Sequence, residues 1–124
     1  MTRAALGLAA IAFAAPALAE PAGLEAAFGN TIVVTYPDGR TAELWLHPDG
    51  TYQAEGRKHN RSNGHWKVKG EKLCLKQSHP FTLPINYCTS LVEGGVGASW
   101  TAKALDGEPI RLQLVRGTVD PAQG

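Results

Sequence analysis

The chain contains few cysteines. Its 124 residues include only Cys74 and Cys88, and neither has a second Cys or a His beside it at metal-ligand spacing. There is also no C-x-x-C pair, so zinc coordination and thiol redox chemistry are the weaker interpretations. We predict a structural disulfide that closes a loop of 15 residues, from 74 to 88. In the chain-entropy model a loop of this size stabilises a small domain by roughly 3 kcal/mol.

Long apolar runs are also scarce, and the main one lies at the N-terminus. Residues 4–15 are almost entirely Ala, Leu, Ile and Phe, and they follow the cationic Arg3. This run is too short for a membrane span of about 20 residues. Pro16 ends it, and residues 17–19 (Ala-Leu-Ala) have the small-x-small form of a leader-peptidase site. We therefore predict that residues 1–19 are a signal peptide, cleaved after Ala19, and that the product is periplasmic or secreted, without a transmembrane segment.

An excess of charge of one sign is lacking too. The whole chain has 12 Lys and Arg against 11 Asp and Glu, and the predicted mature chain is neutral because Arg3 leaves with the leader. A neutral total does not indicate nucleic acid as a partner. Residues 20–124 are enough for one domain and no more.

The sequence is rich in period-two alternation. From Thr31 onward, short stretches with every second residue apolar are separated by turn residues, at a spacing of about 8–12 residues. Pro-Asp-Gly occurs at 37–39 and at 48–50, Asp-Gly occurs at 106–107, and Gly70-Glu71 suits a type II′ turn. The pattern predicts an all-β fold, an antiparallel meander of about eight short strands that forms a small barrel or sandwich.

The alternation also predicts which side chains face inward. They are Leu44, Leu46, Tyr52, Trp66, Val68, Leu73, Leu75, Trp100, Ile110, Leu112 and Leu114. Because three of them are large aromatics in a short chain, we expect a mostly filled interior. Residues 20–30 are predicted to form a short helical lead-in, 31–117 a single β domain and 118–124 a frayed tail. Residues 78–84 contain two prolines and are expected to be irregular.

Four short motifs resemble those of known protein groups. Gly64-His65-Trp66 resembles the G-x-W element of calycins, the lipocalin and avidin class of barrels, whose Trp packs across the base of the barrel. Asp-Gly-Thr-Tyr (49–52), Gly-x-Trp (64–66), Lys-Leu-Cys (72–74) and Tyr-Cys (87–88) are similar, in that order, to motifs of small exported bacterial proteins of uncharacterised families. The resemblance covers most of residues 30–116 and implies a fold and a compartment. It implies no activity and no catalytic residues.

Residue types that often carry catalysis lack the spacing that catalysis needs. No Ser lies in a G-x-S-x-G frame, and no two histidines have H-x-H or H-x-x-x-H spacing. Glu43 and Glu55 could act as a pair of carboxylates, but nothing in the sequence fixes their separation. We predict a protein that is not an enzyme and has no cofactor or metal. A zinc site assembled through the fold stays as an alternative to solvated surface imidazoles for the histidines, which are His47, His59, His65 and His79.

One segment is strongly basic. Between residues 57 and 76 seven cations stand against one anion, Glu71. We predict a hairpin around the Gly70-Glu71 turn. On it the cations would share the solvated face and attract a phosphate-bearing ligand, an anionic lipid headgroup or an acidic protein partner. The alternative is a solubilising face whose lysines block pairing between sheet edges. The candidate binding residues are Arg57, Lys58, Arg61, His65, Lys67, Lys69, Lys72 and Lys76.

Trp45 is a further candidate, because the alternation points it outward with Glu43 and His47. An exposed Trp on a sheet often marks a contact surface; alternatively, both faces of the sheet are covered there. The sequence thus favours a binding module for an anionic envelope component or a protein partner, through the basic face or a barrel mouth lined by Trp and Tyr. The alternative is a small envelope enzyme or inhibitor whose site is assembled from loops.

Overall fold

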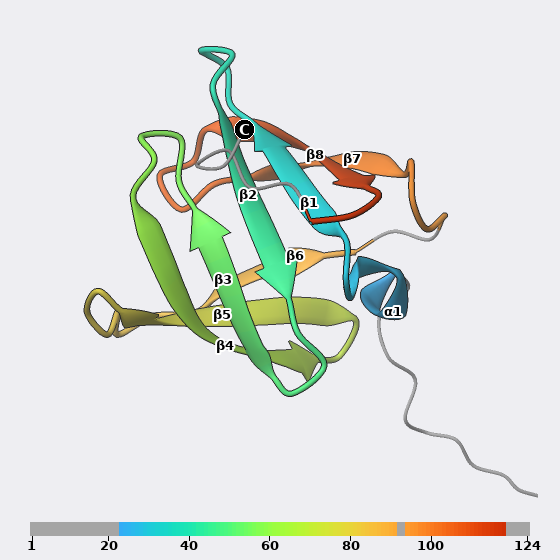
Figure 1. Cartoon of the computed structure of the whole chain (residues 1–124). Helices are drawn as coiled ribbons and strands as arrows, with labels where there is room; N and C mark the ends of the chain where they lie inside the picture. Colours follow the sequence, from blue (N-terminus) through green and yellow to red (C-terminus); the bar gives the residue numbers. More distant parts are fainter. Residues whose placement is uncertain (1–22, 92–93, 119–124) are drawn as a thin grey trace, which may run out of the picture.

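Eight antiparallel strands form one nearly closed, barrel-shaped sheet in the computed structural model, which describes residues 23–91 and 94–118 (Figure 1). This confirms the predicted all-β fold. The predicted signal peptide and residues 119–124 of the predicted tail lie outside the described residues. Among the described residues, no helix has the length and apolarity needed to cross a membrane.

The elements follow one another with short connections. A single helical turn, α1 (Leu24–Ala27), comes first. The strands are β1 (Thr31–Thr35), β2 (Thr41–Leu46), β3 (Thr51–Glu55), β4 (Arg61–Lys69), β5 (Lys72–His79), β6 (Tyr87–Ser90), β7 (Ser99–Lys103) and β8 (Pro109–Val115). Strand β5 ends at His79, so it extends into residues 78–84, which we expected to be irregular.

The barrel closes at one pair of strands and stays open at another. The strand order is β6-β5-β4-β3-β2-β1-β8-β7, so β1 and β8, the first and last strands along the chain, pair with each other. The gap in the ladder therefore falls between β6 and β7. It is bridged by a side chain, because the Tyr87 hydroxyl on β6 donates a 2.6 Å hydrogen bond to the carbonyl oxygen of Lys103 on β7.

The Asp-Gly turns form as their residues predict. Asp38, Asp49 and Asp106 each accept a hydrogen bond, from the backbone N–H two residues on, and the glycine after each has a positive φ. The turn between β3 and β4 has no Asp-Gly pair. His59 takes the left-handed conformation there, with φ of 65°. This absence explains why the start of β4 was not predicted.

The hydrophobic core extends to α1, at one end of the barrel. Leu24 of α1 is buried with Ile32, Leu46, Leu73 and Leu114. All eleven predicted inward residues belong to this core or pack against it. At the same end, the ring of Trp66 lies 5.8 Å from that of Phe28, and its indole nitrogen donates to the carbonyl oxygen of His47.

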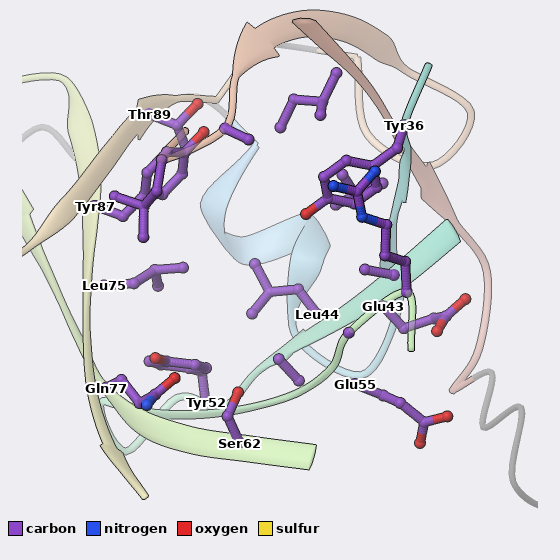
Figure 2. A pocket seen from close by; sticks show the side chains of 18 of the residues that line it. Tyr36, Glu43, Leu44, Tyr52, Glu55, Ser62, Leu75, Gln77, Tyr87 and Thr89 are labelled. Atoms are coloured by element: carbon purple, nitrogen blue, oxygen red, sulfur yellow. The ribbon is translucent and has the colours of Figure 1, made fainter. Parts of the chain in front are cut away.

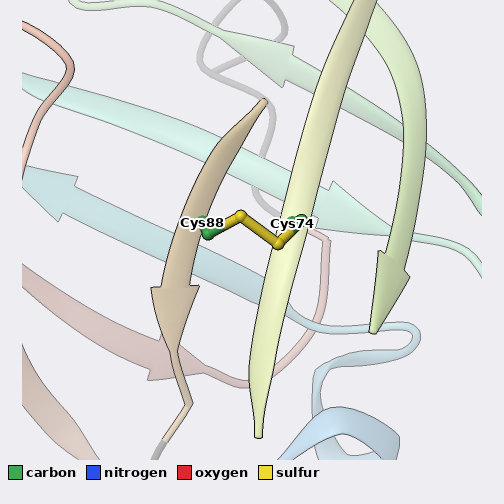
Figure 3. Close-up of a disulfide and its surroundings, with 2 residues drawn as sticks. All are labelled: Cys74 and Cys88. Atoms are coloured by element: carbon green, nitrogen blue, oxygen red, sulfur yellow. A yellow bond between two sulfur atoms is a disulfide. The ribbon is translucent and has the colours of Figure 1, made fainter. Parts of the chain in front are cut away.

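The predicted disulfide is confirmed. Cys74 on β5 and Cys88 on β6 lie directly opposite each other and are bonded (Figure 3). The register places the pair on the outer face of the sheet, since the neighbouring pairs Leu73–Thr89 and Leu75–Tyr87 face inward. The bond thus ties the short edge strand β6 to the long strand β5.

Candidate functional site: a cavity at the open end of the barrel

A cavity of about 400 Å³ occupies the end of the barrel opposite α1. Four connections surround its opening: the turns at 36–40, 56–60 and 104–108, and the β5–β6 loop at 80–86. We call this opening the mouth. The expectation of a mostly filled interior is therefore wrong for this half of the barrel.

The cavity exists because inward residues near the mouth are small. Strands β2, β3 and β4 present Ala42, Ala54 and Ser62 there, and Ala104 follows β7. Deeper in the barrel the same strands present larger side chains, including Leu46, Tyr52 and Trp66. This change from large to small is legible in the sequence, and it is the signal that sequence reasoning missed.

The walls of the cavity are mainly apolar, with a few polar groups. Figure 2 shows Leu44, Leu75, Tyr52 and Tyr87 around the central space. The polar lining includes the hydroxyl of Ser62, the amide of Gln77, the hydroxyls of Thr89 and Tyr36, and the amide of Asn60. A concave, largely apolar site with a few polar groups is typical of small-molecule binding.

Arg57 ties three of the turns at the mouth together. Its guanidinium lies 2.6 Å from Glu108 Oε2 and 3.4 Å from Asp38 Oδ2. It also lies 4.0 Å from the ring centroid of Tyr36, in a cation–π contact. The hydrogen bond that Arg57 donates to the Glu108 carboxylate raises the pKa of Arg57 above its ordinary value, and burial raises the pKa of the Tyr36 phenol. Arg57, predicted for the basic patch, is instead a neutralised part of the mouth.

The mouth also carries exposed apolar side chains. Ile85 and Leu105 line the cavity and are 54% and 58% exposed, and Phe81 in the same β5–β6 loop is 60% exposed. The loop is attached to the barrel by two hydrogen bonds with Gln77, one to the carbonyl oxygen of Phe81 and one from the N–H of Leu83.

The two carboxylates singled out in the sequence belong to residues that lie close together in the lining of the cavity. Glu43 and Glu55 are directly opposite on β2 and β3, and both are buried. Figure 2 shows both carboxylates directed away from the central space. Glu55, only 1% exposed, accepts a hydrogen bond from Arg61 Nε at 2.7 Å and lies 3.2 Å from His59 Nδ1. Arg61, which we predicted for the basic patch, therefore forms an ion pair with Glu55 instead.

The remaining predicted cations form a smaller basic face. Lys67 and Lys69 on β4 and Lys72 and Lys76 on β5 are exposed on the outer face, with His65 opposite Lys76. Among the described residues, no ion pair involves these lysines. Lys58 lies apart from them, in the β3–β4 turn at the mouth. The segment therefore divides into a basic face on one hairpin and three residues elsewhere.

The expectation of an exposed Trp45 is wrong, and the alternative of two covered faces holds. The side chain points outward but is only 6% exposed. Its Nε1 donates to the hydroxyl of Thr31, which in turn donates to the carbonyl oxygen of Gly117. Trp45 is thus tied to parts of the chain that are distant in sequence, and the local sequence does not reveal this contact.

The histidines do not come together. His59 contacts Glu55, His65 lies near Ser78, and His79 lies near Asn63. Within residues 23–91 and 94–118, no group of three or more His, Cys, Asp or Glu side chains is placed to hold a metal ion.

Comparisons with known proteins add no relative: no protein-family model, no curated protein and no solved structure matches the chain.

Proposed function

We propose that this chain is a binding module that takes a small, largely apolar molecule into the cavity of its barrel. The observation that carries the proposal is the cavity itself, about 400 Å³ with mainly apolar walls and an open mouth. Binding pockets for small molecules have volumes of roughly 300–1,000 Å³. The module acts in an oxidising compartment outside the cytoplasm, which the Cys74–Cys88 bond supports.

The size and lining of the cavity define the class of ligand. At roughly 30 Å³ for each water-sized group, the cavity has room for about a dozen such groups. The ligand is therefore a compact molecule or a medium-length chain, with an apolar body against Leu44 and Leu75. One or two polar groups on it would pair with Ser62, Gln77 or Tyr36. The buried carboxylates face outward, which favours binding over chemistry on the ligand.

The test is a titration with N-phenylnaphthylamine, an uncharged probe whose emission rises in apolar surroundings. We expect saturable binding by residues 20–124 of the chain. Ala54→Phe places a ring in the cavity from β3. It should weaken binding by about tenfold, because the ligand loses apolar contacts equivalent to roughly one buried side chain. Gln53→Phe adds the same ring one residue earlier, on the outer face, and serves as the matched control. Equal affinity in the two variants would contradict the proposal.

A second candidate function rests on the basic face. Lys67, Lys69, Lys72 and Lys76 are exposed on one hairpin, with no ion pair among the described residues. Such a face favours an anionic envelope component or an acidic protein partner. Binding to immobilised polyphosphate that weakens with salt, and is lost when Lys67, Lys69 and Lys72 are changed to Glu, would support this function. Unchanged binding by the triple variant would exclude it.

A further inference from the structure

The exposed apolar side chains of the barrel are concentrated at one end. Four large apolar residues are exposed in the described part of the chain: Phe81, Ile85, Val96 and Leu105. Three of them belong to two of the four connections around the mouth, and Val96 is in the loop before β7, outside the cavity lining. Two of the three also line the cavity, so the apolar surface continues from the interior onto the rim.

Cations without a carboxylate partner accompany this apolar rim. Lys58 in the β3–β4 turn and Lys103 at the end of β7 are exposed, and no ion pair of the described residues involves either. Of the anions at the mouth, Asp38 and Glu108 pair with Arg57, and the exposed Asp106 accepts a hydrogen bond from the backbone N–H of Glu108. Exposed apolar side chains flanked by unpaired lysines match the surface of an anionic bilayer, with its acyl chains below and phosphates above.

The proposed ligand gives a reason for such a contact. A small apolar molecule partitions into lipid rather than water, so a protein that takes it up meets it at a bilayer. The mouth is the side from which the cavity opens, and it is also the side that carries Phe81, Ile85 and Leu105. This step rests on the proposed ligand-binding function.

We propose that the barrel docks with its mouth against an anionic lipid bilayer, with Phe81, Ile85 and Leu105 at the interface and Lys58 and Lys103 on the headgroups. The basic face on the β4–β5 hairpin lies outside this contact. Docking in this orientation presents the cavity directly to the lipid.

The test is co-sedimentation of the protein with vesicles of phosphatidylcholine alone or mixed with phosphatidylglycerol. We expect binding to the mixed vesicles only. Phe81→Ser, at a residue outside the cavity lining, should weaken it by about tenfold. Val96→Ser removes a 38% exposed apolar side chain elsewhere and should leave binding unchanged. Equal loss in both variants, or no dependence on phosphatidylglycerol, would overturn the proposal.

Two charge-reversal variants test the orientation. Lys58→Glu with Lys103→Glu should weaken vesicle binding by more than about tenfold, from about fivefold for each lysine removed. Lys67→Glu with Lys69→Glu changes as much charge on the basic face and should have a small effect. The reverse result would show that the basic face is the membrane contact and would overturn mouth-down docking. Sedimentation velocity without vesicles decides whether the rim instead joins two copies of the chain, which would overturn it as well.

The probe titration separates this proposal from the proposed function. Phe81→Ser should bind N-phenylnaphthylamine in solution as tightly as the natural chain, because Phe81 does not line the cavity. Probe binding without vesicle binding would reject the docking alone. Vesicle binding by the natural chain, with probe affinity equal in Ala54→Phe and Gln53→Phe, would reject the ligand function and retain the docking surface.

Discussion

Gly64 is the residue where side-chain size is most tightly constrained. It faces the interior opposite Tyr52, at the bulge where the register of β4 and β5 shifts. A Cβ atom there would overlap the carbonyl oxygen of Lys76, which is backbone and cannot turn away. The Gly-x-Trp motif thus has a physical reason at its first position, namely the close approach of two strands.

We expect Gly64→Ala to lower the free energy of unfolding by about 3 kcal/mol, the upper range for overpacking. The matched change is Gly39→Asn, in a turn with positive φ and open space around it, which should cost about 1 kcal/mol. Urea denaturation measures both. A loss at Gly64 no larger than that at Gly39 would contradict the packing described at the bulge.

Two turn aspartates make stability depend on acid pH. The hydrogen bonds that Asp49 accepts from Thr51, and Asp106 from Glu108, lower the pKa of each carboxyl below its ordinary value. A carboxyl whose pKa is lower in the folded state stabilises the fold when ionised. This contribution is complete above the unfolded pKa of about 3.9 and is lost as the pH falls through the folded value.

The melting temperature should therefore fall as the pH drops below about 4, and the fall should be smaller in Asp49→Asn with Asp106→Asn. Asparagine keeps an acceptor oxygen for the backbone N–H groups but has no proton to bind. Thermal melts from pH 7 to 2.5 make the comparison. A fall of the same size in the double variant would show that these turns are not the source.

Among the elements, β6 depends most on a single covalent bond. It is four residues long, pairs only with β5, and faces β7 across the gap in the ladder. Tyr87 and Thr89 on this strand form one wall of the cavity. The Cys74–Cys88 bond therefore supports the wall of the candidate site as well as the fold.

Replacing both cysteines with Ala should destabilise the protein by about 3 kcal/mol, and the largest increase in amide exchange should occur at residues 87–90. Probe affinity should fall together with the protection of the β6 amides from exchange, even under conditions in which the variant remains folded. Exchange that increases evenly over all strands would contradict this local role of the bond.

The three turns that meet at Arg57 give another test at the level of elements. Arg57→Met keeps an apolar stem over Tyr36 but removes the ion pairs with Glu108 and Asp38. We expect faster amide exchange in the turns at 56–60 and 104–108, with the strands unchanged. Arg40→Met is the control, because Arg40 is exposed and lies 4.0 Å from Asp38. Equal effects of the two changes would argue against Arg57 as the link.

How far the sequence predicts these elements depends on how local the cause is. The turns at Gly39, Gly50 and Gly107 depend on residues next to each other, and each was predictable. The β3–β4 turn uses His59 with positive φ, so its signal was absent. The burial of Trp45 depends on Thr31 and Gly117, which are far from it in sequence, and only the folded chain brings them together.

For the whole molecule, the sequence predicted the sheet and its inner face but not the hollow within it. The inward positions followed from alternation, and the disulfide followed from the two cysteines. The cavity depends on Ala42, Ala54 and Ser62 meeting at one end of the barrel. That meeting requires the register of three strands, which period-two patterns leave open. The small inward residues are visible in the sequence, but their meeting at one end of the barrel is not.

Native mass spectrometry of the protein recovered from its own compartment tests the central claim most directly. We predict two species, the oxidised chain from residue 20 onward alone and the same chain with one small molecule bound. The bound species should be absent from Ala54→Phe and present in Gln53→Phe. Finding only the bare chain in the natural protein and in both variants, together with no saturable probe binding, would contradict the account.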